Sequence, residues 1–92
     1  MAETRGGLPV TLYTRTECGL CDEVMAELER LAARYPLRLS IVDIGQDAEL
    51  EDRFGEVIPV VDVAGTLLYA PIDPWTLRSE ISRARKRWLK TG

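Results

Sequence analysis

The feature that most constrains this chain is the placement of its only two cysteines, which lie three positions apart in Cys18-Gly19-Leu20-Cys21. A disulfide scaffold spreads its cysteines along the chain, whereas a bridge between these two would close almost no loop and would stabilise little. The pair therefore indicates chemistry rather than a structural cross-link. The chain has no histidine, which excludes Ser-His-Asp catalysis, Cys-His catalysis and Cys/His zinc sites.

The segments on either side of the cysteine turn have different periodicities. Residues 10–14 alternate and are rich in β-formers, which predicts a strand that leads directly into the turn. The apolar positions that follow have helical spacing over more than three turns, and Pro36 ends this helix. The predicted apolar stripe of the helix consists of Cys21, Val24, Met25, Leu28, Leu31, Ala32 and Tyr35.

The rest of the chain divides into short segments separated by turn and cap signals. Asp47 and Gly55 are a predicted N-cap and stop, Ala64-Gly65 is a hairpin signal, and Asp73-Pro74 is an N-cap followed by a first helical residue. The predicted elements are a strand over 37–44, a helix over 47–54, strands over 57–63 and 66–69, and a final helix after Asp73.

The same patterns predict which side chains share a face of each element. In the second strand, Leu37, Leu39 and Ile41 should share one side. In the last helix the inward stripe comprises Leu77, Ile81, Ala84 and Trp88. Packing between helices and sheet, rather than a substrate platform, is the prediction for Tyr13, Trp75 and Trp88.

The order of elements is β-α-β-α-β-β-α, and it restricts the topology. A strand, a helix and a second strand in one sheet form a right-handed parallel crossover, while the last two strands form an antiparallel hairpin. An α/β fold with a mixed four-stranded sheet flanked by three helices satisfies both. Ninety-two residues with 46% apolar content suffice for one core. We therefore predict a flexible lead-in over residues 1–8 and one domain over 9–92.

Two stretches resemble the glutaredoxin branch of the thioredoxin superfamily, in particular short bacterial glutaredoxin-like proteins. Residues 10–21 are similar to the glutaredoxin opening, a strand ending in Tyr-Thr-Lys followed by Cys-Pro-Tyr-Cys; Arg15 stands in place of the lysine and Gly19 in place of the proline. Val57-Ile58-Pro59 is similar to the family's Thr-Val-Pro, whose proline is cis and faces the cysteines. The resemblance extends to about Trp88 and implies a thioredoxin-like fold.

The predicted activity is thiol–disulfide exchange. Cys18 would lie at the helix N-terminus, where free backbone N–H groups and the helix dipole stabilise a thiolate, so it is the candidate nucleophile. Cys21, one turn further and on the apolar stripe, is the candidate resolving thiol. Residues three apart on a helix are within disulfide reach. Arg15 favours the Cys18 thiolate, whereas Glu17 and Asp22 disfavour it.

The resemblance also implies substrate-binding positions. A cis Pro59 would turn the backbone of Ile58 outward, where an extended substrate could pair with it; the alternative is a proline that only blocks edge pairing. Arg15 is either a ligand for a substrate carboxylate or an ordinary loop cation. Asp73 matches the aspartate that opens the last helix in glutathione-binding relatives, but the preceding glycine pair is absent. The expectation is no bound cofactor or metal, with glutathione or another thiol as reductant.

The charge distribution is uneven, although the formal net charge is −3. Residues 17–56 carry eleven acids and four bases, whereas residues 78–90 carry six bases and one acid. The basic final helix is either an ordinary solvated face that complements the helix dipole or a surface for an acidic partner. No aromatic-interleaved basic strand accompanies it, which argues against nucleic acid. The predicted partners are disulfide-containing proteins or low-molecular-weight thiols.

Two other functions are consistent with the sequence. The fold could be a redox-inactive binding module, with a partner on the basic helix through Arg83, Arg85 and Arg87. It could also be a metal or iron–sulfur carrier in which two subunits share a cluster, because two cysteines cannot fill four coordination sites. No secretory signal and no membrane-spanning run is recognisable, so the expectation is a cytoplasmic protein.

Overall fold

The computed structural model describes residues 7–91, with side chains to residue 88. Its elements follow the predicted order, with one extra 3₁₀ turn after the second strand. They are β1 (Leu8–Thr14), α2 (Gly19–Ala32), β2 (Leu37–Asp43), η1 (Ile44–Gln46), α3 (Ala48–Phe54), β3 (Val60–Val63), β4 (Thr66–Tyr69) and α4 (Pro74–Thr91). The predicted fold class, a mixed four-stranded sheet with three helices, is confirmed.

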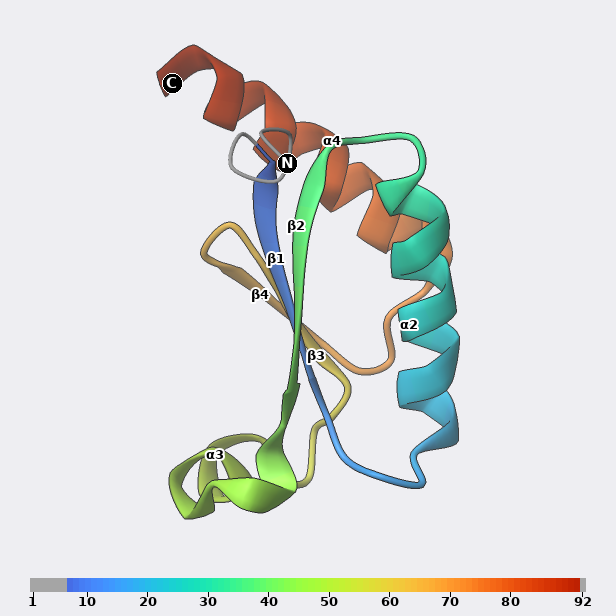
Figure 1. Ribbon diagram of the computed structural model, residues 1–92, viewed down its shortest axis with the longest axis vertical. Helices are drawn as coiled ribbons and strands as arrows, with labels where there is room; N and C mark the ends of the chain where they lie inside the picture. The colour runs from blue at the N-terminus through green and yellow to red at the C-terminus, as the bar shows by residue number, and fades with distance from the viewer. Residues whose placement is uncertain (1–6, 92) are drawn as a thin grey trace.

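The sheet has the strand order β2-β1-β3-β4. Strands β1 and β2 are parallel in the register Leu8 to Leu37, and α2 is the crossover between them. Strand β3 is antiparallel to β1 and to β4. Figure 1 shows α2 and α4 beside one face of the sheet, while α3 lies at the end where β2 finishes. The C-terminal end of β1 therefore delivers the chain to the cysteine turn below α2.

Two apolar clusters hold the layers together. The larger one joins α2 and α4 to the sheet, and the smaller one lies under α3 and contains Ile44, Phe54 and Val60. Tyr13 packs against this second cluster, with its ring 4.8 Å from that of Phe54. The buried members of the larger cluster are Leu8, Val10, Leu12, Val24, Leu28, Leu31, Val61, Val63, Leu77, Ile81 and Ala84.

The helix cap and the hairpin turn that were predicted for the short elements are present in the structure. Asp47 caps α3 by accepting hydrogen bonds from the N–H groups of Glu49 and Leu50, and Gly55 follows its last residue. Ala64 and Gly65, with φ of 49° and 103°, form the two-residue hairpin between β3 and β4. Positive φ at both positions matches the right-handed twist of the paired strands. Asp62 supports this turn by accepting a hydrogen bond from Gly65.

Several predicted boundaries are wrong. Strand β3 begins only at Val60, because residues 57–59 form the approach to it and Pro59 has no N–H for a ladder. Strand β1 already includes Leu8, which is buried; of the predicted lead-in, residues 1–6 lie outside the described residues. Of the three residues predicted to share one side of β2, Leu37 and Leu39 contact the larger cluster, and Ile41 on the same edge strand is 45% exposed.

Trp75 departs from its predicted packing role. Trp75 is 68% exposed in the first turn of α4, and Trp88 is 37% exposed near the end of that helix. Helix α4 covers the sheet through Leu77, Ile81 and Ala84.

Within the described residues, no helix is both long and apolar enough to cross a membrane.

Candidate functional site

The cysteine turn lies between the end of β1 and the start of α2. Glu17 has a φ of 59°, a left-handed conformation that reverses the chain immediately before Cys18. Cys18 is the N-cap of α2 and has extended backbone angles. Its Sγ accepts a hydrogen bond from the N–H of Cys21 at 3.2 Å. One of the free amides of the helix N-terminus is therefore directed at the sulfur of Cys18, as the sequence predicts.

The two cysteines form a disulfide, with Cα atoms 5.2 Å apart. Their surroundings differ, because Cys18 is half-buried at the helix start, whereas Cys21 is 1% exposed. The more exposed cysteine is thus the residue that caps the helix.

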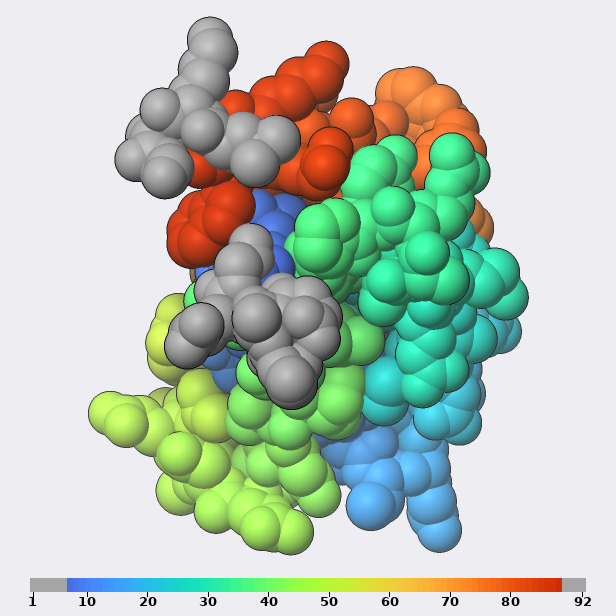
Figure 2. Space-filling view, turned by 45° about the horizontal axis from the view of Figure 1, so that its top comes forward, coloured from blue at the N-terminus to red at the C-terminus, as the bar shows by residue number. Residues whose placement is uncertain are grey.

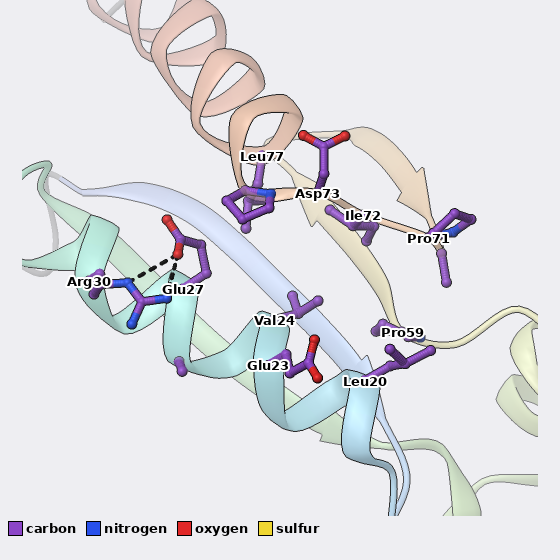
Figure 3. A pocket seen from close by; sticks show the side chains of 13 residues that line it. Leu20, Glu23, Val24, Glu27, Arg30, Pro59, Pro71, Ile72, Asp73 and Leu77 are labelled. Carbon is purple, nitrogen blue, oxygen red and sulfur yellow. Dashed lines mark hydrogen bonds and ion pairs between the residues drawn. The ribbon is translucent and has the colours of Figure 1, made fainter.

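Pro59 lies beside the first turn of α2. The Ile58–Pro59 peptide bond is cis, as the family resemblance implies. Pro59 is almost completely buried, and together with Leu20 it lines one end of a groove (Figure 3). The side chain of Ile58 packs against the cluster under α3. Leu20, between the cysteines, is 58% exposed.

The groove runs from the cysteine turn along α2 to the start of α4. Its volume is about 550 Å³. Figure 3 shows the α2 side chains on one side and the loop from β4 to α4 on the other. The lining residues are Leu20, Glu23, Val24, Ala26, Glu27, Arg30, Pro59, Ala70, Pro71, Ile72, Asp73, Pro74 and Leu77.

Asp73 is both an N-cap and a groove residue. Its carboxylate accepts hydrogen bonds from the backbone N–H of Thr76 at 2.8 Å and from the Thr76 hydroxyl at 2.9 Å. The backbone hydrogen bond, and then the hydroxyl, hold the pKa of Asp73 below its ordinary value. This position therefore carries a negative charge at neutral pH, whatever the groove holds.

Arg15 lies on the other side of the cysteine turn. Its Nη2 and Nε donate to the two carboxylate oxygens of Glu51 at 2.5 and 3.2 Å, and Nη2 also donates to the carbonyl of Gly55 at 3.2 Å. Both side chains of the ion pair are 39% exposed. The structure thus brings Arg15 to α3 and its C-cap, while Pro59 and Asp73 line the groove.

Some groove residues were not identified from the sequence. Glu23, Glu27 and Arg30 are spaced as neighbours on one helical face, next to the apolar stripe, and this periodicity was the available signal. No sequence feature indicated that the Ala70–Pro71 peptide bond is also cis. Within residues 7–91, no group of three or more His, Cys, Asp or Glu side chains could hold a metal ion.

Comparison with known proteins gives a family match over most of the chain. Residues 9–83 match the model of the glutaredoxin-like domain (DUF836). The structure of target protein XcR50 from X. campestris is 35% identical, with 80% of this chain and 96% of that chain covered and a TM-score of 0.69. Comparison with curated protein sequences gave no significant match.

Two other solved structures are similar in fold. Protein Ne2328 from Nitrosomonas europaea is 22% identical, with 80% of this chain and 91% of that chain covered and a TM-score of 0.67. The thioredoxin of Fasciola hepatica is 25% identical over 90% of this chain and 86% of its own, with a TM-score of 0.62. The arrangement of sheet and helices is therefore shared with thioredoxins.

Proposed function

Since the chain belongs to the glutaredoxin-like domain family (DUF836), we propose that it is a thiol–disulfide oxidoreductase in which Cys18 attacks and Cys21 resolves. The observation that carries the proposal is the asymmetry of the pair. Cys18 is a half-buried N-cap whose sulfur accepts a hydrogen bond from a backbone N–H, and its disulfide partner Cys21 is 1% exposed. A helix N-terminus favours the thiolate over the thiol, and the thiolate is the reactive form.

The reaction consists of two exchanges. The Cys18 thiolate attacks one sulfur of a substrate disulfide, forming a mixed disulfide and releasing the other substrate sulfur as a thiolate. The Cys21 thiolate then attacks Sγ of Cys18, which releases the second substrate thiolate and forms the Cys18–Cys21 disulfide. The substrate gains two electrons and the protein loses two. A dithiol, or two molecules of a monothiol such as glutathione, returns the protein to its reduced form.

The second step needs little movement of the backbone. The Cα atoms of Cys18 and Cys21 are 5.2 Å apart, which is within the range that a disulfide accommodates. Burial of Cys21 keeps external disulfides from its sulfur while Cys18 remains within reach. Pro59 lines the groove next to Leu20, and the backbone of Ile58 is the position at which an extended substrate would pair beside Cys18.

The groove favours protein or peptide disulfides over glutathione as substrates. Glu27 binds Arg30 through both Nε and Nη2, so these two charges compensate each other. Glu23 and Asp73 leave the groove with a negative balance that opposes the two carboxylates of glutathione. The loop on the α4 side also contributes two prolines, which have no N–H to offer a carboxylate. A neutral or basic peptide segment fits this lining.

Trapping of the mixed disulfide tests the proposed order of attack. Reduced Cys21→Ser should accumulate a covalent adduct with a peptide disulfide on Cys18, and Cys18→Ser should accumulate none, with mass spectrometry as the readout. Both variants should lose turnover in insulin reduction by dithiothreitol. A wild-type protein that is inert towards every disulfide, or variants that keep wild-type turnover, would overturn the proposal.

The preference for basic substrates has a separate test. Glu23→Gln should slow reduction of a lysine-flanked peptide disulfide by roughly two- to fivefold, the effect of one exposed charge pair. Reduction of a glutamine-flanked peptide should change by less. Glu29→Gln is the matched control, because Glu29 is an exposed residue of the same helix that does not line the groove. Equal effects of the two variants would contradict the assignment of Glu23 to substrate selection.

A further inference from the structure

A second hollow lies at the other end of α2 from the cysteines. Its volume is about 360 Å³, and it is lined by Tyr35, which follows α2, and by one flank of α4. In Figure 2, α4 (orange to red) lies beside the segment that joins α2 to β2 (green). The remaining lining residues are Arg78, Ser79, Ser82, Arg83 and Lys86. The hollow shares no residue with the groove at the cysteine turn.

Its cations are available to a ligand. Arg78, Arg83 and Lys86 are exposed, and none has an ion pair or hydrogen bond to another described side chain. The only acid of α4, Glu80, is within 3.8 Å of Arg87 and does not line the hollow. Three positive charges and two serine hydroxyls therefore face the same space without a negative partner among residues 7–91.

Two more guanidinium groups lie near the ring of Tyr35. Arg85 lies 5.7 Å from the ring centroid of Tyr35, and Arg34 lies 6.0 Å from it. Both distances are within the range of a cation–π interaction. Because the ring faces these cations, it does not offer an open platform on which a base could stack.

We infer that this hollow binds an acidic segment of a partner protein. Carboxylates match its chemistry, since arginine and lysine donate charge-assisted hydrogen bonds and the serines add neutral donors. Outside residues 78–90 the chain has fourteen acidic and six basic residues. A long polyanion such as nucleic acid would be repelled by that remainder, whereas a short acidic segment contacts only the basic hollow.

The site is independent of the proposed thiol exchange. Partner binding at α4 neither needs a reduced Cys18 nor requires turnover. The acidic segment of a partner would bind at the basic hollow beside α4. The cysteine turn, at the opposite end of α2, would stay open (Figure 1). The hollow therefore supplies a docking surface that does not compete with the groove.

NMR titration of the ¹⁵N-labelled full-length protein tests the inference. The probe is a short synthetic peptide of alternating glutamate and glycine, and its glutamine–glycine counterpart is the neutral control. The acidic peptide should shift the amides of Tyr35, Ser79, Ser82 and Arg83 and leave those of the cysteine turn unchanged. Arg83→Glu should weaken binding by about tenfold. Arg53→Glu, the same charge change on α3, should weaken it by less than about twofold.

The outcomes that overturn the inference are distinct. If the acidic peptide shifts no amides at the hollow, the hollow does not bind it and the inference is wrong. If Arg83→Glu and Arg53→Glu weaken binding equally, only the overall charge of the protein matters. Tighter binding of a single-stranded oligonucleotide than of the peptide at the same amides would replace the acidic partner with nucleic acid. Cys18→Ser should bind the peptide as the wild type does, so failure of the redox proposal would leave this result standing.

Discussion

The Arg15–Glu51 ion pair links the loop that carries Cys18 to α3, and its strength can be predicted from its geometry. Two nitrogen–oxygen contacts of 2.5 and 3.2 Å make it bidentate, and both side chains are 39% exposed. Exposed pairs contribute about 0.2–1 kcal/mol, and bidentate geometry with partial burial favours the upper half of that range. We therefore expect a coupling free energy of about 0.5–1 kcal/mol.

A double-mutant cycle measures this coupling. Arg15→Gln, Glu51→Gln and the double variant are compared with the wild type by urea denaturation, at low and at high ionic strength. The coupling should shrink in high salt, because both groups are partly exposed. The Arg30–Glu27 pair, spaced i,i+3 on α2 with side chains 68% and 17% exposed, is the reference and should give about 0.3–0.5 kcal/mol, because both Arg30 nitrogens donate to one carboxylate oxygen. A coupling of zero between Arg15 and Glu51, or one that does not respond to salt, would refute the reasoning.

The same variants distinguish the two roles that the sequence left open for Arg15. If the residue positions the loop, Arg15→Gln and Glu51→Gln should change the rate of thiol exchange in the same direction and by similar factors. If it binds a substrate carboxylate, Glu51→Gln should release the guanidinium and improve turnover of glutathione disulfide, while Arg15→Gln should impair it. We expect the first pattern, because the guanidinium is already bound to Glu51 and to the Gly55 carbonyl.

Three further predictions concern stability. Gly19→Ala should raise the free energy of unfolding by about 0.4–1 kcal/mol, because Gly19 starts α2 with ordinary φ and a Cβ there meets nothing within 4 Å; urea denaturation measures it, and a loss of stability would contradict it. Leu28→Ala should lower the free energy of unfolding by about 2.7–5 kcal/mol, since Leu28 is 0% exposed. Leu20→Ala, at a 58% exposed position, should lower it by less than about 0.5 kcal/mol. Equal losses in the two variants would contradict the assigned core. The Asp73 carboxylate should stabilise the fold relative to Asp73→Ala at every pH above its ordinary pKa of 3.8. This stabilisation should disappear as the pH falls through the lowered pKa of the folded state. A stabilisation that decreases as the pH is raised would contradict the prediction.

Local physical chemistry made much of the fold predictable. The helical stripe that contains Val24 and Leu28 is observed in the core. Asp47 caps α3, and Ala64-Gly65 forms the hairpin, because cap and turn residues act through their own backbone neighbourhood. The position of Cys18 at a helix N-terminus followed from the same local signals.

The features that depend on tertiary contacts were not predictable in this way. The start of β3 is set by its pairing with β1, which reaches only from Val60 to Val63, and a run of apolar residues does not reveal that limit. The exposure of Ile41 and Trp75 depends on how far the helices extend over the sheet. The groove arises where α2 meets the loop before α4, so its acidic lining emerged only from the packing of distant segments.

The redox midpoint potential of the Cys18–Cys21 pair tests the central proposal most directly. The protein is equilibrated in buffers of defined thiol–disulfide ratio, and the fraction of disulfide is read by alkylation and mass spectrometry. We expect one reversible two-electron transition at roughly −220 to −320 mV, the range of a reducing cytosolic poise. A pair that cannot be reduced and reoxidised reversibly would contradict thiol–disulfide exchange and leave a binding domain.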